Sequence, residues 1–334
     1  MKNLLSLFSL FVSMLFISCN SEDMNPTTQN SVDVYVAGQK NNQACYWKNN
    51  QEVLLTDGLG ARADTIAVVN SNVHVFGKQN FDNFTTDFLY WKNNVKTNLS
   101  ETLSTPSHML IKITGMDVVG DDVYFVGYTK NPIIAAEIYE LAYWKNGVKT
   151  ELASATNPTY KSKIKVVNNT VYVTAFNLNC FNSCNGFYVN GAFTAVDFNI
   201  TLEDFAVKDN EVYVYGNNYT TQTGYFKNIT TNVETTTPNT ILKMIFELNN
   251  TYILNDNSIT KNGAATTTAV SSNGITSYTS YIKDFNVLNG NVYYINNCAP
   301  LLGLPFCLVG INNTNVFQID NGSSYFNGIT IVQN

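Results

Sequence analysis

Two histidines are the first side chains of this chain that could transfer protons or bind a metal ion. His74 lies within a short apolar segment, whereas His108 follows Ser104-Thr105-Pro106 and has no motif partner. With only 2 histidines in 334 residues, we expect neither a Ser-His-Asp arrangement nor a multi-histidine metal site. No glycine-rich phosphate loop opens a helix either. We therefore predict no catalytic triad, no metal site and no cofactor.

Carboxylates offer the remaining acid–base chemistry. The candidates in predicted loops are Asp57, Asp82, Asp87, Glu101, Glu137 and Glu140. General acid–base catalysis needs two such groups held on either side of the reacting bond. These residues form no recognisable pair in the sequence. We therefore assign no catalytic residue.

The 6 cysteines are the other reactive residues. Cys180 and Cys184 fall within one predicted loop, and Cys298 and Cys307 within another, so local disulfide pairing is the simplest assignment. Such bonds fit an oxidising compartment. Zinc binding by these four is the alternative, although their spacings match no standard finger. We expect Cys45 to be a small buried residue.

The first residues form a targeting segment. Lys2 supplies a positive start, and the apolar run Leu4 to Ile17 is too short to span a membrane comfortably. The run ends at Ser18-Cys19, which resembles the bacterial lipoprotein signal. That resemblance implies that residues 1–18 are removed, that Cys19 carries the lipid and that residues 19–31 form a polar tether. The only membrane attachment would then be the lipid.

Acidic residues follow the predicted lipidation site. Glu22-Asp23 in the tether resembles the surface-export signal of Bacteroidota lipoproteins, although an acidic tether can also arise by chance. We expect the protein in the bacterial envelope, anchored in the outer membrane and either exposed at the cell surface or facing the periplasm.

Two short motifs alternate from residue 33 to the end of the chain. The first is Asp33-Val34-Tyr35-Val36-Ala37-Gly38, and further copies start at Asn72, Asp122, Thr170, Glu211, Asn250 and Asn291. The second is Tyr46-Trp47-Lys48-Asn49, with clear copies at Tyr90 and Tyr143 and weaker copies at Tyr188, Tyr225, Thr260 and Gly310. A repeat of about 40 to 50 residues that contains short strands is typical of propeller blades.

Each repeat can be divided into four strands joined by Asn-rich turns, because Asn and Gly accept positive φ at low cost. The chain begins with a second strand at Val34 to Ala37 and ends with a first strand at Gly328 to Val332. We therefore predict an all-β fold for residues 32–334: a single seven-bladed β-propeller of four-stranded antiparallel blades, closed by pairing of the N- and C-terminal strands in one blade. The weakest copy lies around 245–270.

The repeats resemble bacterial seven-bladed propeller lipoproteins of kelch-like pattern. The paired glycines of true kelch repeats and the Trp-Asp dipeptide of WD40 repeats are absent, so the resemblance implies the fold and no particular function. Trp47, Trp91 and Trp144 share one repeat position, which favours packing between blades over sugar stacking. His74 replaces the tyrosine of the other copies, so we expect it in the core.

The net charge of the chain argues against one class of function. A formal net charge of −6 and the lack of a basic cluster in the sequence argue against nucleic acid binding. We expect a monomeric, non-catalytic binding module for a protein, peptide or glycan. The alternative is a propeller lyase or hydrolase that acts on polysaccharide with loop carboxylates.

Long, variable loops are predicted at one end of the blades, where function usually resides. We predict that the ligand-binding residues lie there: Arg62, His108, Tyr128, Tyr139, Leu301, Leu302, Leu304 and Phe306.

Overall fold

The computed structural model describes residues 31–80, 86–133, 139–154, 161–177, 184–255, 258–268, 278–300, 304–319 and 323–334. The chain divides into two compact units, one made of Met1–Val32 and Gln333–Asn334, the other of Asp33–Val332. The predicted signal peptide and Cys19 lie outside the described residues. In the described part, no helix is long and apolar enough to cross a membrane.

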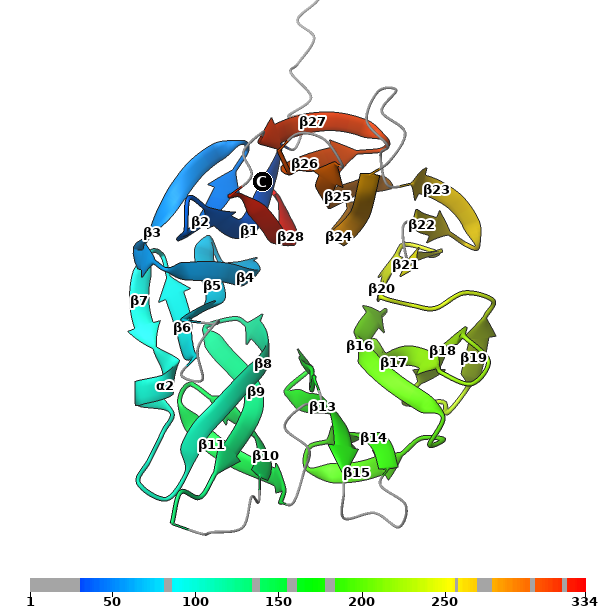
Figure 1. The fold of residues 1–334 in the computed structure, drawn as a ribbon. Coiled ribbons are helices and arrows are strands. Elements are labelled where there is room, and N and C mark those ends of the chain that lie inside the picture. The colour runs from blue at the N-terminus through cyan, green and yellow to red at the C-terminus, as the bar shows by residue number, and fades with distance from the viewer. Residues whose placement is uncertain are drawn as a thin grey trace, which may run out of the picture. The chain divides into compact units, whose positions relative to one another are not determined.

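The larger unit contains seven four-stranded antiparallel sheets that follow one another around a ring (Figure 1). With the innermost strand first, the first four blades are β28 (Tyr325–Gln333), β1 (Val32–Lys40), β2 (Gln43–Lys48), β3 (Gln51–Leu59); β4 (Ala61–Val69), β5 (Asn72–Gln79), β6 (Asp87–Lys92), β7 (Val95–Asn98); β8 (Met109–Val119), β9 (Asp122–Lys130), β10 (Tyr139–Lys145), β11 (Val148–Ala153); and β12 (Ile164–Val167), β13 (Thr170–Asn177), β14 (Cys184–Val189), β15 (Ala192–Ala195). A four-residue helix, α2 (Leu99–Thr102), follows β7.

The remaining three blades have the same order. They are β16 (Ile200–Lys208), β17 (Glu211–Asn218), β18 (Thr223–Asn228), β19 (Glu234–Thr237); β20 (Lys243–Glu247), β21 (Asn250–Asn255), β22 (Ser258–Lys261), β23 (Ala264–Thr268); and β24 (Tyr278–Leu288), β25 (Asn291–Pro300), β26 (Phe306–Ile311), β27 (Thr314–Ile319). The weakest sequence repeat therefore forms a complete blade, β20–β23. Strand β28 pairs beside β1, which confirms the predicted closure of the first blade.

The two sequence motifs are joined within a blade by a set of hydrogen bonds, called here the clasp. In the blade β8–β11, the backbone N–H of Asn146 donates to the Val123 carbonyl (2.9 Å), and the Asn146 side-chain oxygen accepts from the Val123 N–H (2.9 Å). The Asn146 amide also donates to Asp122 (2.7 Å). The same side-chain acceptor recurs at Asn49, Asn93, Asn190, Asn262 and Asn312. The clasp explains why a terminal Asn is retained where the aromatic part of the motif weakens.

These asparagines also close the hairpins between third and fourth strands. Asn146 has φ 50° and Gly147 has φ 86°, and Asn49 and Asn50 have φ 48° and 69°. Two successive positive φ values define the primed turns that match the right-handed twist of paired strands. The Asn-Gly and Asn-Asn turns predicted from the sequence are confirmed.

The core lies between neighbouring blades. Trp144 and Phe125 of one blade pack with Phe76 and Tyr90 of the preceding blade in one buried cluster. Trp47, Trp91 and Trp144 are at most 2% exposed, which confirms their predicted packing role. His74 is also buried, and its Nδ1 lies 2.6 Å from the Tyr90 hydroxyl. Burial lowers the pKa of His74, as does the charge of Lys92 to a smaller extent.

The predicted disulfide between Cys298 and Cys307 is not formed in the structure, where both residues are thiols. In the β25–β26 pairing Cys298 is opposite Phe306, and Cys307 is opposite Asn297. Directly opposed residues share a face and successive residues alternate, so the two sulfur atoms lie on opposite faces of the blade. Cys298 packs with Tyr294, while the Cys307 thiol donates to the Ser324 carbonyl (3.0 Å).

The other cysteines have different outcomes. Cys45 is completely buried, as predicted, and burial raises the pKa of its thiol well above the usual value. The predicted Cys180–Cys184 bond depends on side chains that lie outside the described residues, as does the zinc alternative for the four cysteines.

Candidate binding surface at the long-loop end

Each blade has two ends that differ in the lengths of their connections. Short turns such as Asn70–Ser71 and Asn146–Gly147 join first to second and third to fourth strands, and their end is called here the short-turn end. The opposite, long-loop end carries the second-to-third loops and the connections between blades. Two second-to-third connections, residues 41–42 and 256–257, are nevertheless only two residues long, and in the blade β16–β19 the third-to-fourth connection (229–233) is longer than the second-to-third (219–222). The predicted asymmetry therefore holds in the blades β4–β7, β8–β11, β12–β15 and β24–β27 and fails in the other three.

Exposed aromatic side chains collect at the long-loop end. In the described part of the chain they are Phe198, Tyr219, Tyr281 and Tyr325, with exposures of 65%, 52%, 45% and 46%. Phe198 precedes β16 and Tyr219 follows β17, and the Tyr219 N–H donates to the Asn199 carbonyl (3.1 Å). The exposed apolar residues of the short-turn end, such as Val95 and Val148, are aliphatic. Aromatic rings with a wet edge are characteristic of recognition surfaces.

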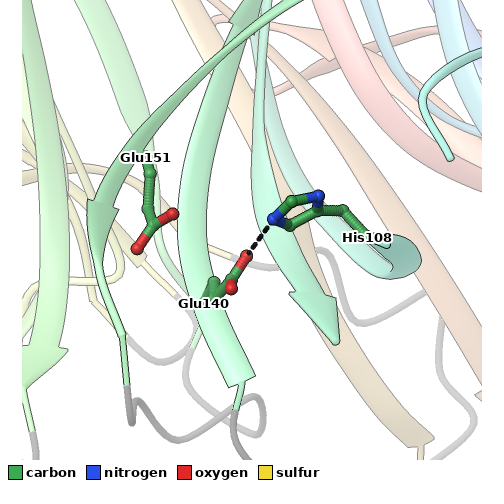
Figure 2. A group of neighbouring side chains, drawn as sticks. All are labelled: His108, Glu140 and Glu151. Atoms are coloured by element: carbon green, nitrogen blue, oxygen red, sulfur yellow. Dashed lines mark ion pairs between the residues drawn. The ribbon is translucent and has the colours of Figure 1, made fainter. Parts of the chain in front are cut away.

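A second feature of this end is a group of three ionisable residues from different elements of one blade region. His108 lies in the turn before β8, Glu140 is at the start of β10, and Glu151 is on the outer strand β11 (Figure 2). One potential metal-ligand atom from each lies within 4.8 Å of the others. His108 Nε2 is 3.5 Å from Glu140 Oε2, the pair joined by the dashed line in Figure 2.

Glu140 is held by several donors. Lys149 Nζ donates to Glu140 Oε2 over 2.8 Å, and the Thr129 hydroxyl donates to the same oxygen over 2.9 Å. Burial opposes ionisation of Glu140, but the hydrogen bonds from Lys149 and Thr129 prevail and lower its pKa. Glu140 is therefore a carboxylate near neutral pH and is poorly suited to donate a proton as a general acid.

His108 is oriented by its own turn. Its Nδ1 lies 2.9 Å from the Ser107 hydroxyl, and its backbone N–H donates to the Thr105 carbonyl (3.1 Å). The three residue types suit a divalent transition metal, but Glu140 Oε2 is already occupied by Lys149 and Thr129. We interpret the group as a polar contact between the blade connection, through His108, and β10, where Glu140 is ion-paired with Lys149. Sequence reasoning missed it because the three residues become neighbours only through strand pairing and the folded turn.

The structure places the predicted binding residues in different surroundings. Arg62 lies in strand β4 and not in a blade connection, and its Nε is 2.9 Å from Asp64 Oδ1. Leu304 is 69% exposed at the long-loop end, and Tyr139 is half-buried beside Lys130, whose Nζ is 5.9 Å from the ring centre. His108 belongs to the ion-paired group.

Two of the predicted residues are core residues, which corrects the prediction. The Tyr128 side chain is completely buried and its hydroxyl lies 2.9 Å from that of Ser162 in the next blade. Phe306 is buried against the apolar cluster of β24 and β25. In both cases the strand extends further than predicted, and alternation turns the side chain inward. Leu301, Leu302, Asp82 and Glu137 lie outside the described residues.

Comparison with known proteins shows the fold alone. No family model matches the chain, and no curated protein is similar to it. Among solved structures, the periplasmic gluconolactonase PpgL of Pseudomonas aeruginosa aligns with a TM-score of 0.52 and 8% identity, over 90% of this chain and 99% of the gluconolactonase. The acylaminoacyl peptidase of Pyrococcus horikoshii aligns with a TM-score of 0.51 and 9% identity, over 85% of this chain and half of the peptidase.

Proposed function

We propose that this chain is a lipid-anchored protein of the bacterial envelope that acts as a non-catalytic binding module, with a glycan, peptide or protein as its ligand at the long-loop end. The observation that carries the binding role is that the exposed aromatic side chains of the described residues all lie at this end, at Phe198, Tyr219, Tyr281 and Tyr325. A rigid scaffold that displays variable connections on one side is a common arrangement for recognition.

The proposed anchor rests on the sequence. Ser18-Cys19 at the end of the apolar run fits lipidation, and several acyl chains would hold the protein stably because each buried methylene contributes about 0.8 kcal/mol. The test is a Cys19→Ala variant followed by cell fractionation. We expect release from the membrane fraction. Equal membrane association of the variant and the original chain would contradict the anchor and leave the binding role unaffected.

The binding role is tested with two matched sets of apolar-to-polar substitutions. One variant carries Phe198→Ser and Tyr219→Ser at the long-loop end, and the control carries Val95→Ser and Val148→Ser at exposed positions of the short-turn end. Both variants and the original chain are applied to arrays of defined glycans and peptides after circular dichroism has confirmed folding. We expect at least a tenfold loss of binding in the first variant only. Loss in the control, or retention in both, would show that the wrong end has been chosen.

The polysaccharide-cleaving alternative finds little support in the described carboxylates. Glu140 and Glu151 are close together, but the low pKa of Glu140 disfavours the proton-donating role that glycosidic cleavage requires. Release of reducing ends from a polysaccharide, abolished by Glu140→Gln, would establish the enzyme in place of the binding module.

A further inference from the structure

Each blade presents one equivalent residue at the long-loop end, in its innermost strand or just before it, and these seven residues are called here the axial ring. In four blades, a backbone distance shows that the residues are equivalent. The carbonyl oxygens of Tyr325, Arg62, Lys112 and Thr201 lie 2.1, 2.1, 2.0 and 2.0 Å from the position that a Cβ atom would take on the glycine of the adjacent second strand. All four therefore occupy the same register in β28, β4, β8 and β16.

The other three members of the axial ring are identified by the buried residue that follows each of them in the chain. Ile282, Ser162 and Ile241 are at most 2% exposed, like Ala63 and Ile113, which follow Arg62 and Lys112. Both Ser162 and Ile241 contact a side chain of the preceding blade: the Ser162 hydroxyl lies 2.9 Å from that of Tyr128, and the Ile241 N–H donates to the Asn217 side-chain oxygen (2.6 Å). The preceding residues complete the axial ring: Tyr281, Lys161 and Thr240.

One arc of the ring is basic. Arg62 lies in β4 and Lys112 in β8, and Lys161 comes three residues before β12 of the next blade. Lys78 on β5 pairs with Arg62 across the sheet, so it adds a fourth cation. Burial lowers the pKa of Lys112, and the charges of Lys78 and Lys161 lower it further. These lysines therefore lie close enough to repel one another.

Two acidic residues lie beside the basic arc. Asp64 binds two of its cations, with Oδ1 2.9 Å from Arg62 Nε and Oδ2 3.3 Å from Lys78 Nζ. Glu203, which interacts with Lys161, has its pKa raised by burial despite that cation. Four cations gathered at one end of a chain of net charge −6 create a local field that attracts an anion.

The arc beside it is aromatic. Tyr281 and Tyr325 belong to β24 and β28, the two strands that precede β4 around the ring, and both are exposed. Two tyrosines followed by three cations make a surface with stacking rings at one side and carboxylate-binding groups at the other. Guanidinium and ammonium groups bind carboxylates, and tyrosine offers a flat amphipathic face to a sugar ring.

We propose that the axial ring binds an acidic sugar, a uronate-type residue whose ring stacks on Tyr281 or Tyr325 and whose carboxylate is bound by Arg62, Lys112 and Lys161. This inference rests on the proposed binding function and specifies its ligand class. The ligand recognised is the carboxylate-bearing sugar itself, and the neutral form of the same sugar binds poorly.

The test uses defined oligosaccharides. Hexamers of galacturonate and of mannuronate, and the methyl ester of each, are titrated by calorimetry against the original chain at 50 and 200 mM salt. We expect at least one acidic hexamer to bind at least tenfold more tightly than its uncharged ester, and more weakly at high salt. No binding of either acid, or equal binding of acid and ester, would overturn the proposal.

Variants locate the site. Lys112→Gln with Lys161→Gln should weaken acidic hexamer binding at least tenfold, and Tyr281→Ala with Tyr325→Ala should weaken it about as much. The matched control is Lys208→Gln, at the short-turn end of innermost strand β16, and it should change affinity less than twofold. Because Lys112 is half-buried, Lys161→Glu at the exposed position provides a second charge variant. Unchanged affinity in folded Lys161→Glu and in the tyrosine variant would overturn the assignment to this ring.

Inorganic phosphate distinguishes a sugar site from a simple anion site. Millimolar phosphate that displaces the hexamer fully, together with tyrosine variants that bind normally, would show an anion site without sugar recognition and overturn the proposal. Binding of neutral glycans that is lost in the Phe198 and Tyr219 variant, with no preference for uronates, would retain the proposed function and refute only this inference.

Discussion

Single polar side chains connect neighbouring blades at the long-loop end. Asn297 of β25 donates its amide to the Phe326 carbonyl (2.8 Å) and accepts from the Phe326 N–H (3.1 Å). Asn217 makes the same two-way contact with Ile241, and Gln39 donates to the Ala61 carbonyl (3.2 Å). Each contact satisfies main-chain groups of an innermost strand on the side where that strand has no sheet partner.

Replacing Asn297 with alanine tests the strength of this contact. Asn297 is buried, so the variant leaves a buried N–H and a buried carbonyl of Phe326 without their partner, and we expect a loss of about 1–3 kcal/mol in the free energy of unfolding. Asn315→Ala on the outer strand β27, where the side chain is exposed, is the control and should change stability by less than about 0.5 kcal/mol. Urea unfolding followed by tyrosine fluorescence measures both, and equal stabilities would show that the contact contributes nothing.

His74 gives the core a defined pH dependence. Burial lowers its pKa, so below about pH 6.5, the ordinary value for histidine, the unfolded chain takes up a proton that the folded chain does not. The free energy of unfolding should therefore fall as the pH falls below this value, by at most about 1.4 kcal/mol per pH unit for one proton.

The control is His74→Tyr, because the equivalent pair in the first blade is Tyr35 and Tyr46, with ring centres 6.4 Å apart against 6.0 Å for His74 and Tyr90. Urea titrations of both chains at pH 7.5 and 5.5 should show the smaller pH effect in the variant. Identical pH profiles would mean that His74 does not titrate differently on folding.

At the scale of the strands, glycines of the second strand allow the close approach of the innermost strand. A Cβ atom on Gly216 would lie 2.0 Å from the Thr201 carbonyl oxygen and 2.7 Å from the Leu202 Cα atom. Both atoms belong to the backbone of β16, next to the bulge between Leu202 and Asp204. The glycine and the bulge therefore act together to bend the innermost strand.

Gly216→Ala should consequently cost about 3 kcal/mol or more, at the upper end of the range for overpacking, because backbone must move. Gly120→Ala is the matched control: its φ is +59° and no atom lies within 4 Å of the added Cβ, so only the backbone conformation is penalised, by about 1 kcal/mol. Thermal unfolding of the two variants should separate these costs. A Gly216→Ala chain as stable as Gly120→Ala would contradict the tight approach.

The repeat predicted the strands well because local chemistry repeats with them. The Asn of each third-to-fourth turn, with its clasp to the second strand, marks the hairpins in the sequence even where Trp is lost, as at Asn262 and Asn312. Strand ends at the long-loop end were predicted less well. Tyr128 and Arg62 fall within strands because β9 and β4 extend past the repeated motif, into segments that differ from blade to blade.

The surface groups could not be predicted from spacing. Arg62, Lys112 and Lys161 are about 50 residues apart in sequence and become neighbours only because successive blades bring equivalent positions, in or just before their innermost strands, together around the ring. The sequence therefore showed no basic cluster. His108, Glu140 and Glu151 are brought together in the same way, by the pairing of β10 with β11 and the turn that precedes β8.

At the scale of the whole propeller, the ring is closed by its last strand. Beside the Asn297 contact with Phe326, Asp284 accepts from the Ile329 N–H (3.0 Å) and is paired with Lys243 (2.6 Å). The carboxylate thus joins the innermost strands of three successive blades, β20, β24 and β28. Closure covers the inner edge of β1, which could otherwise pair with another chain.

Removing residues 325–334 tests how far the ring depends on this closure. Phe326 and Ile329 are buried, and their loss costs about 1.5–3 kcal/mol each, to which unpaired Asn297 and Asp284 add about 1–3 kcal/mol each. The sum approaches the total stability of an ordinary domain, about 5–15 kcal/mol. We therefore expect the truncated chain to melt at least about 15 °C lower or to aggregate through the exposed edge of β1.

A chain that begins at Ser31 keeps every blade strand and should melt within about 2 °C of the full chain. Adding a synthetic peptide of residues 325–334 should restore the truncated chain in part, and a truncated chain that melts like the full one would show that the other six blades hold the ring without closure.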